Sequence, residues 1–480
     1  MTATSQTSIR TSEPAKEELS PGKKTWILVI ALTTYLMIVL DISIVIAGLP
    51  EIGHDFQLSP VNLSWVQNAY LLCFGGLLLV GARAGDAYGR KRMMGIGLAI
   101  FTLASLMIGA APNAMVLIAS RAGQGIGAAI LAPAVLSLIA TTFAEGEERT
   151  KALAWYSMVA GAGASLGLVL GGILTEQVSW RVGFYINVPI GIGLMLAVWR
   201  YLASPRVGDI QIDFIAGLAS TMGMGTLVFG IVHSAQYGWG DPMTIGSLLM
   251  AAVLLGCFLF GEKRSTHPMV PLWLFTHRTR AGAYVARMLF LGAIVSFFFF
   301  TTQLLQEVLG YTPMQAGLAF LPVTIPTFIA GMMVPYFTRR MGNGGLLCLS
   351  LGMCSAGMFW LSLADDSAWY WSDIALPMIA IGFGNGFALG PLTVAGLTEV
   401  PHHHQGVASG VVNVAHQLGG TLGLAILVVV FASAEFPQWS ANAILAGKIS
   451  AATTGGAVMT LFAMLIAFAF VLPKVKPREA

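Results

Sequence analysis

Long runs of apolar residues recur along almost the whole chain, separated by short polar connections. A helix needs about 20 apolar residues to cross the hydrocarbon core of a bilayer. Fourteen runs approach or exceed this length, and we expect each to form one transmembrane helix. The predicted spans are 26–49, 63–83, 93–111, 114–142, 151–174, 183–203, 212–233, 243–261, 281–307, 313–337, 344–363, 370–397, 405–432 and 453–472.

Lysine and arginine gather in every second connection. Positively charged connections are retained in the cytosol, so this pattern predicts that both termini are cytosolic. The connections predicted to lie outside hold only Arg181 and Lys448. The predicted cytosolic segments hold, among others, Lys23, Lys24, Arg90, Lys91, Arg92, Arg149, Lys151, Arg206, Lys263, Arg264, Arg278, Arg280, Arg339, Arg340, Lys474 and Lys476.

A weak internal repeat divides the chain. Gly89 to Arg92 follow the second span, and Arg339 to Gly342 follow the tenth, at matching places in two six-helix halves. Repeated halves around a site near the membrane midplane are a transporter architecture. We therefore expect an all-α membrane protein with two six-helix bundles and two inserted helices. The expected parts are a cytosolic tail (1–25), an N-terminal bundle (26–203), the inserted pair with its cytosolic linker (204–280), a C-terminal bundle (281–472) and a second cytosolic tail (473–480).

The composition excludes several classes of protein. Hydrophobic residues make up 56% of the chain and charged residues 10%, whereas a soluble domain carries about 25% charged residues. A net charge of +3 leaves no electrostatic footprint for nucleic acid. The residues Met1 to Lys24 contain no cleavable signal pattern, and no nucleotide-binding G-x-x-x-x-G-K-[ST] loop is present, so neither ATP nor another cofactor is expected.

No metal site or disulfide is expected. The four cysteines all lie in apolar runs, and nothing in their spacing suggests a disulfide framework. The run His402 to His404 follows Pro401 in a short connection. Adjacent histidines in a turn do not converge easily on one ion, so we interpret this run as a solvated loop.

One acidic residue, Asp41, lies inside the first apolar run. A charge within the hydrocarbon core is costly and by default indicates function. Burial favours the neutral form of a carboxyl group, so Asp41 is expected to load and release a proton or to hold a cation. The structural alternative is an aspartate paired permanently with a base.

The fourth span contains a basic residue, Arg121. Counted from Pro50 and Asn113 at 1.5 Å per residue, Asp41 and Arg121 both lie roughly 12–13 Å below the same membrane surface. An unpaired arginine at that depth is expensive, so a partner or a water-filled cavity is expected. We expect Arg121 to tune Asp41, directly or through water. The alternative is that Arg121 bonds backbone carbonyls and braces the fold.

Asp86 stands at the cytosolic end of the second span, before Gly89, Arg90, Lys91 and Arg92. It can pair with a basic residue or cap a neighbouring helix in only one conformation, so we predict a gating element here. The alternative is a loop whose positive charge only sets the topology.

The fifth span carries Gly163, Gly167, Gly171 and Gly172. The i, i+4 spacing of the first three leaves a smooth face on which a neighbouring helix can pack closely and slide or rock. Plain tight packing is an equal alternative.

Polar residues also interrupt the second half. Glu307 lies near the outer end of its span, where it is a second candidate for protonation or a plain interfacial carboxylate. His416 lies near mid-depth and could titrate near neutral pH, or line the cavity as a neutral histidine. The further candidates for a substrate cavity are Tyr35, Trp65, Gln67, Tyr70, Gln303, Asn385, Asn413 and Gln417. Aromatic rings among them are suited to stacking on a lipophilic cation.

Together, these segments resemble the fourteen-helix drug:proton antiporters, a branch of the major facilitator superfamily. The resemblance rests on the segment from Leu40 to Pro50, on the loop around Asp86 and on Arg121 with Gly125. Further matches are Ser179-Trp180-Arg181 with Phe184, Asn187, Val188 and Pro189, then Gln306 to Tyr311, and Gly406 to Gly410. Leu168, Ala87 and His416 depart from the family pattern, which usually has proline, a basic residue and arginine there.

The resemblance implies alternating access between two bundles, with exchange of protons for drugs, dyes or quaternary ammonium compounds. It implies coupling or cation-binding by Asp41, coupling by Arg121, and gating by Asp86 with Arg90. It also implies a monomer in the lipid of the bacterial inner membrane. The alternatives are an exporter of one metabolite or self-made antibiotic, a membrane-embedded enzyme, and a non-transporting sensor. An enzyme would need a convergent catalytic set, and neither G-x-S-x-G nor H-E-x-x-H occurs.

Overall fold

The chain folds into helices only, over the part that the computed structural model describes: residues 20–144, 146–202, 214–265, 268–401, 404–436 and 440–472. The helices of the first half are α1 (Pro21–Phe56), α2 (Pro60–Tyr88), α3 (Arg90–Gly109), α4 (Ala114–Thr142), α5 (Glu147–Gln177), α6 (Trp180–Tyr185) and α7 (Asn187–Tyr201). Those that follow are α8 (Phe214–Tyr237), α9 (Pro242–Arg264), η1 (Leu272–Phe275), α10 (Arg278–Gln303), η2 (Leu304–Val308), α11 (Pro313–Ala319), α12 (Leu321–Leu361), η3 (Tyr370–Ala375), α13 (Leu376–Gly396), α14 (Gln405–Ser433), α15 (Ala441–Ile466) and η5 (Ala467–Val471).

Polar caps set where several helices begin. Ser59 accepts a hydrogen bond from the backbone N–H of Asn62 before α2, and Asn113 does the same for Val116 in α4. Thr312 and Gln315 form a reciprocal capping box at α11. Such caps satisfy backbone donors that the helix leaves unpaired. The caps therefore mark where one helix ends and the next begins.

Twelve helical stretches among the described residues are long and apolar enough to cross a membrane. One of them, Pro313–Leu361, covers the predicted span 313–337 and all but the last two residues of the predicted span 344–363. Its backbone leaves the helical conformation at Gly342 (φ 71°, ψ 166°), which glycine adopts without steric penalty. The predicted span 151–174 corresponds to α5, a helix of 31 residues that is not among the twelve.

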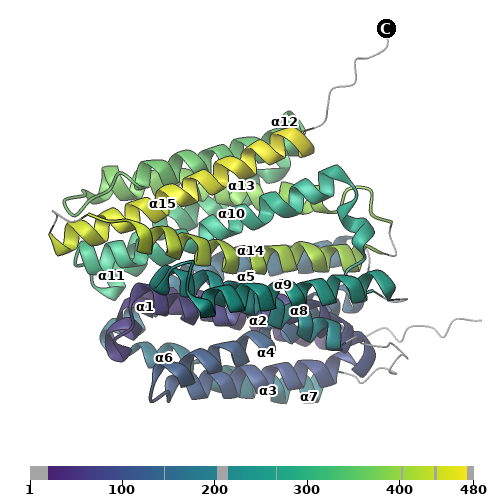
Figure 1. The fold of residues 1–480 in the computed structure, drawn as a ribbon. Coiled ribbons are helices and arrows are strands. Elements are labelled where there is room, and N and C mark those ends of the chain that lie inside the picture. The colour runs from purple at the N-terminus through teal and green to yellow at the C-terminus, as the bar shows by residue number, and fades with distance from the viewer. Residues whose placement is uncertain are drawn as a thin grey trace, which may run out of the picture.

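The two halves of the chain form two bundles (Figure 1). Helices α1 to α7 make the N-terminal bundle and α10 to α15 the C-terminal bundle, and α8 and α9 lie along the boundary between them. Helix α8 packs against α2 of one bundle and α14 of the other. The end at which α1 begins and α15 ends is here named the tail end, and the opposite end is named the far end.

The internal repeat is visible in the backbone. Gly89 (φ 89°) joins α2 to α3, and Gly342 (φ 71°) marks the matching turn of the second half, within α12. Each turn follows the second predicted span of its half of the chain. The shared left-handed glycine supports the predicted correspondence of the two halves.

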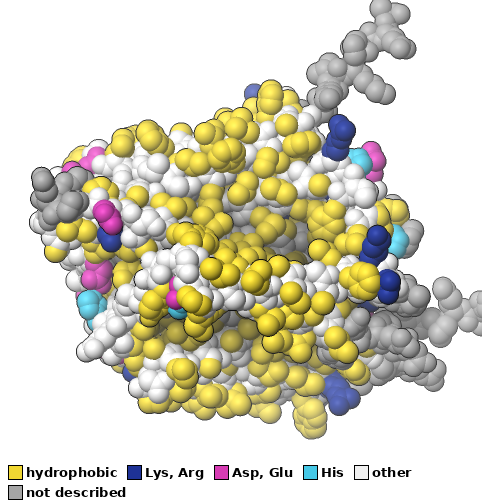
Figure 2. Space-filling model, viewed as in Figure 1, with side chains coloured by type: hydrophobic (Ala, Val, Ile, Leu, Met, Phe, Trp, Pro, Cys, Tyr) yellow, Lys and Arg dark blue, Asp and Glu magenta, His cyan; other side chains and the backbone are white. Residues whose placement is uncertain are grey.

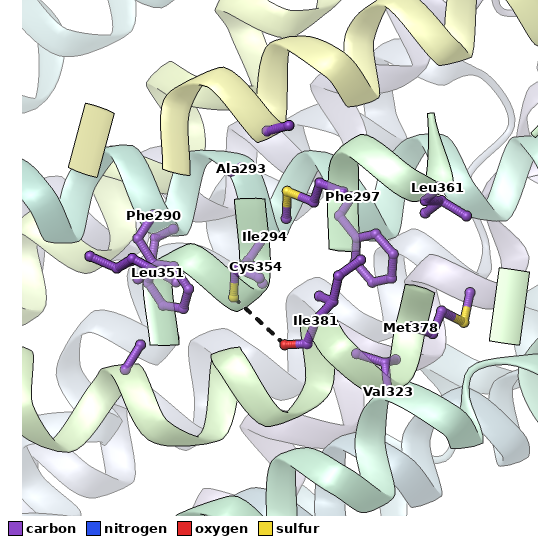
Figure 3. Close-up of a cluster of buried hydrophobic side chains, with 14 of the residues drawn as sticks. Phe290, Ala293, Ile294, Phe297, Val323, Leu351, Cys354, Leu361, Met378 and Ile381 are labelled. Atoms are coloured by element: carbon purple, nitrogen blue, oxygen red, sulfur yellow. Dashed lines mark hydrogen bonds between the residues drawn. The ribbon is translucent and has the colours of Figure 1, made fainter. Parts of the chain in front are cut away.

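The C-terminal bundle is held by a buried apolar cluster (Figure 3). It joins α10, through residues such as Phe290 and Phe297, to α12 and α13, through Leu351 and Ile381. The Cys354 thiol donates to the Ile381 carbonyl at 3.7 Å within it. A thiol so enclosed behaves as a small apolar side chain.

The last span was predicted wrongly at its start. It was expected to begin at residue 453, with Lys448 in an outer connection, but α15 begins at Ala441 and includes Lys448. The ammonium group lies 5.8 Å from the centre of the Phe431 ring, a cation–π contact that tolerates a charge within a helix. The sequence pattern alone offers no such partner.

The exposed surface separates by chemistry (Figure 2). Apolar side chains cover the broad face, and lysine and arginine side chains lie mainly at the right-hand end, which is the tail end. The predicted tail 1–25 is shorter than expected, because α1 begins at Pro21. Predictions were also made for residues 1–19, 203–213, His402, His403 and 473–480, which lie outside the residues that the structure describes.

Candidate functional site

Asp41 and Arg121 form a direct ion pair in the interior of the N-terminal bundle. Arg121 Nη1 donates to Asp41 Oδ2 at 2.6 Å, and neither side chain is exposed (0% each). Asp41 Oδ1 accepts two further hydrogen bonds, from Gln124 Nε2 at 2.8 Å and from Asn187 Nδ2 at 2.9 Å. The carboxylate therefore has three donors, contributed by α4 and α7.

Several partners of this pair were not predicted as site residues. Gln124 lies one turn after Arg121, so both side chains leave α4 on the same face, and Gln124 Oε1 accepts from Arg121 Nη1 at 2.6 Å. Gln124 Nε2 also donates to Ser105 Oγ of α3 at 2.7 Å. The sequence could have indicated Gln124 and Asn187, because an amide side chain inside an apolar span needs a hydrogen-bond partner.

Arg121 makes both of the kinds of contact that were weighed for it. Besides pairing with Asp41, its Nε donates to the Val66 carbonyl of α2 at 3.0 Å, so it also braces the bundle. Its guanidinium carbon lies 4.4 Å from the centre of the Tyr70 ring. Nη2 of Arg121 and the hydroxyl of Tyr70 have no hydrogen-bond partner among the described residues.

All three donors of the Asp41 carboxylate come from helices other than α1: Arg121 and Gln124 from α4, and Asn187 from α7. The hydrogen bonds of Asp41 therefore depend on the relative positions of α1, α4 and α7.

Glu307 lies at the far end, in contact with the other bundle. It belongs to the π-helical turn η2, and its Oε1 lies 2.8 Å from His54 Nε2 of α1. The neighbouring Gln306 donates to the Ala47 carbonyl of α1 at 3.0 Å. Met314 N–H of α11 donates to Glu176 of α5 at 3.0 Å. These three contacts hold the two bundles together at the far end.

The glycines of α5 serve two different interfaces. A Cβ on Gly163, Gly167 or Gly171 would meet α1 of the same bundle, at Leu36, Ser43 and Ile44 respectively. The predicted smooth face therefore packs against α1. Gly172 points elsewhere, because a Cβ there would overlap the Pro313 carbonyl of α11 in the C-terminal bundle.

The predicted gating loop makes its contacts within the N-terminal bundle. Asp86 is exposed, and its Oδ1 lies 3.8 Å from Nη2 of Arg90. Among the described residues, Arg90 is the only basic residue of this loop that forms an ion pair with Asp86. Arg90 donates to Thr141 Oγ1 of α4 at 2.9 Å, and Lys91 to the Trp199 carbonyl of α7 at 2.8 Å. Arg92 is exposed.

A second contact between helices, an ion pair, also lies at the tail end. Lys24 Nζ, in α1, donates to Glu148 Oε1, in the first turn of α5, at 2.8 Å. This hydrogen bond lowers the pKa of the Glu148 carboxyl. Like the contacts of the predicted gating loop, this ion pair joins helices of the N-terminal bundle only.

His416 contacts a buried arginine that was not predicted. Arg287 Nη2 of α10 lies 3.3 Å from His416 Nδ1 of α14, and Arg287 Nη1 donates to Thr393 Oγ1 of α13 at 3.0 Å. Arg287 is 6% exposed. It stands inside the apolar run 281–307, where a charge is costly, so its sequence position was a usable signal.

The predicted cavity residues do not gather in one place. Tyr35 stacks on Tyr156 of α5 (centroids 4.0 Å apart), and Trp65 lies against Phe229 of the inserted helix α8 (6.2 Å). Tyr70 lies in the buried Arg121 cluster and is 0% exposed, so it does not line an open surface. Gln67 is also buried.

The remaining candidates lie on or near the C-terminal bundle. Gln303 is buried and donates to the Phe299 carbonyl of its own helix, and Asn385 donates to Thr327 Oγ1 at 3.4 Å. Asn413 is exposed, and Gln417 of α14 packs close to Gly75 of α2. The four residues predicted to couple protons thus lie in three places: Asp41 with Arg121, Glu307 at the far end, and His416 beside Arg287. Within the described ranges, no group of three His, Cys, Asp or Glu side chains is placed to hold a metal.

Comparison with known proteins is consistent with this architecture. A family model described as the Major Facilitator Superfamily matches residues 31–424. The chain is 36% identical over 432 residues to the cephamycin export protein CmcT of Amycolatopsis lactamdurans, covering 89% of each protein. It is 36% identical over 455 residues to the puromycin resistance protein pur8 of Streptomyces alboniger, covering 93% of this chain and 88% of that one.

The fold is also found among solved structures. The crystal structure of a bacterial homologue of the human lysosomal transporter Spinster, inward-facing and occupied, matches with a TM-score of 0.68. The match covers 94% of this chain and 98% of that chain, at 14% identity. At this identity the likeness concerns the fold alone.

Proposed function

The chain belongs to the Major Facilitator Superfamily, and on that premise we propose that it exports small lipophilic or cationic compounds in exchange for protons. It is a multi-pass transporter of the bacterial plasma membrane, with relatives named for antibiotic export and resistance. The exchange with protons and the class of substrate are the proposed part.

The buried pair of Asp41 and Arg121 carries this proposal. Placing two charges in a membrane interior is expensive, and a bundle that needed only stability would do as well with apolar residues. Asp41 is the one acidic residue of α1 before Pro50, and movement of α4 or α7 would withdraw its donors. Proton uptake by Asp41 is thereby tied to the conformation of the bundle.

Alternating access supplies the movement in this proposal. The far-end contacts of Glu307 and Gln306 with α1 would represent one closed gate, which must open for release of the substrate. The concentration of basic residues at the tail end supports a cytosolic location of both termini. Counting α5 as a further span and the stretch kinked at Gly342 as two would give the fourteen predicted spans. We also propose that the transporter acts as a monomer.

The second candidate is an exporter dedicated to one metabolite or self-made antibiotic. The names of the two relatives favour it, since one is an export protein for cephamycin and the other a resistance protein for puromycin. Both candidates share the proposed proton coupling and differ only in the breadth of substrates.

The test uses purified protein in liposomes that carry a pH gradient. We expect a fluorescent lipophilic cation, rhodamine 123, to accumulate in the vesicles only while the gradient persists, and an ionophore that removes the gradient to stop it. Protein-free vesicles are the control. Failure to move any member of a varied cation panel would reject broad drug export and favour the dedicated exporter.

A further inference from the structure

The C-terminal bundle contains a buried cation that the proposed proton pathway does not use. Arg287 lies on α10, nine residues after the helix begins at Arg278, which places it about 13 Å along the helix from the tail end. Its side chain reaches across to α13 and α14, at Thr393 and His416. It joins three helices of one bundle.

No acidic residue of these helices neutralises Arg287. The sequences of α10, α12, α13, α14 and α15 contain neither aspartate nor glutamate. The acidic residues closest in sequence to Arg287 contact other groups: Glu307 lies 2.8 Å from His54, and Glu262 accepts from the Val270 N–H at 2.8 Å. Arg121 in the N-terminal bundle, by contrast, has Asp41 at 2.6 Å. One intramembrane arginine is therefore paired and the other is not.

The two contacts of Arg287 are with neutral groups. A guanidinium only donates, so the 3.3 Å contact requires an unprotonated Nδ1 on His416. Thr393 supplies a hydroxyl, which accepts without carrying charge. Nε of Arg287 has no hydrogen-bond partner among the described residues. The cluster thus keeps one full positive charge, and the Nε–H donor of Arg287 is unused among the described residues.

A buried charge of this kind is stable when an anion pairs with it. A carboxylate suits the site best, because its two oxygens match the planar fork of a guanidinium. Thr393 and His416 are only half-buried, and Asn413, one turn before His416 on α14, is exposed. The unpaired cation therefore lies beside a polar, accessible face of α14.

We propose that Arg287, with His416 and Thr393, binds a carboxylate group of the transported compound. This inference rests on the proposed function and narrows it to compounds that carry an acidic group besides a lipophilic or cationic body. Asp41, proposed above as the proton site, and Arg287 then lie in different bundles and have different tasks.

The test measures binding to the full-length protein in detergent, by fluorescence anisotropy of two matched dyes. Rhodamine 110 carries a free carboxylate, and rhodamine 123 is its methyl ester. We expect the wild type to bind rhodamine 110 more tightly than rhodamine 123, and Arg287→Gln to reduce that preference by about tenfold or more, through loss of a charge-assisted pair. Binding of rhodamine 123 should change little.

The matched control is Arg278→Gln, which removes the same charge from an exposed position of the same helix and should leave the preference unchanged. If Arg287→Gln does not fold, Arg287→Lys takes its place, because it keeps the charge, loses the fork, and should reduce the preference by about threefold. The proposal is overturned if the wild type shows no preference for the carboxylate, or if variants of Arg287 weaken both dyes equally. Because binding needs no gradient, these results are independent of whether transport is coupled to protons.

Discussion

Asp41→Asn is expected to reduce gradient-driven uptake of rhodamine 123 to the level of protein-free vesicles. Asparagine has nearly the same shape, and its oxygen still accepts from Arg121, but it cannot take up a proton. The cycle then lacks the step in which a proton displaces the donors Gln124, Asn187 and Arg121. Uptake in pH-gradient liposomes measures the effect.

Two further variants separate coupling from folding. Losing one partner of a buried pair costs about 3–5 kcal/mol of stability, so thermal melting of Asp41→Asn must be recorded beside its transport. Asp41→Glu keeps a titratable group and should retain part of the gradient dependence. Asp366→Asn changes an exposed aspartate of the loop after α12 and should leave uptake unchanged. Normal uptake by Asp41→Asn would move the proton site to Glu307 or His416.

Gly317→Leu is expected to abolish transport while leaving each bundle folded. Gly317 of α11 faces α5 across the far end, and a Cβ there would lie 2.5 Å from the Leu168 carbonyl. Backbone cannot move aside as a side chain can, so the closed far end is destabilised by about 1–3 kcal/mol. The ratio of closed to open protein then falls by a factor of about 5 to 150, and the protein shifts towards the open far end.

The comparison variant is Gly193→Leu on α7, where a Cβ would meet nothing within 4 Å. It should transport as the wild type does. Increased reactivity of a cysteine placed at Gln306 in the Gly317→Leu background would report the open far end directly. Wild-type transport by Gly317→Leu would show that the contact between α5 and α11 plays no part in the cycle.

Most of the helices could be predicted from the sequence, because a membrane span leaves a long apolar run whatever it packs against. One boundary failed: the start of α15 was placed after Lys448, whose contact with the Phe431 ring is invisible to a pattern of charges. The turn predicted between two spans near Gly342 is present, because the backbone leaves the helical conformation at that residue.

The part of the site that could be predicted is the part that depends only on the depth of a residue in the membrane. Asp41 and Arg121 were expected at the same level and lie in direct contact. The contributions of Gln124 and Asn187 depend on which faces of α4 and α7 turn inward, and that is settled by packing. Arg287 was missed although its position inside the apolar run 281–307 was a usable signal. The absence of aspartate and glutamate from its own helix is a property on which its proposed role depends. The proton-coupling, cavity and gating roles remain predictions.

The most direct test of proton-coupled export measures protons instead of substrate. Liposomes containing a trapped pH-sensitive dye, without a preformed gradient and with the membrane potential clamped, receive rhodamine 123 on the outside. Wild-type protein should raise the internal pH as the compound enters and protons leave, and Asp41→Asn should not. Entry of the compound into wild-type vesicles with no change of internal pH beyond that of protein-free vesicles would contradict the account.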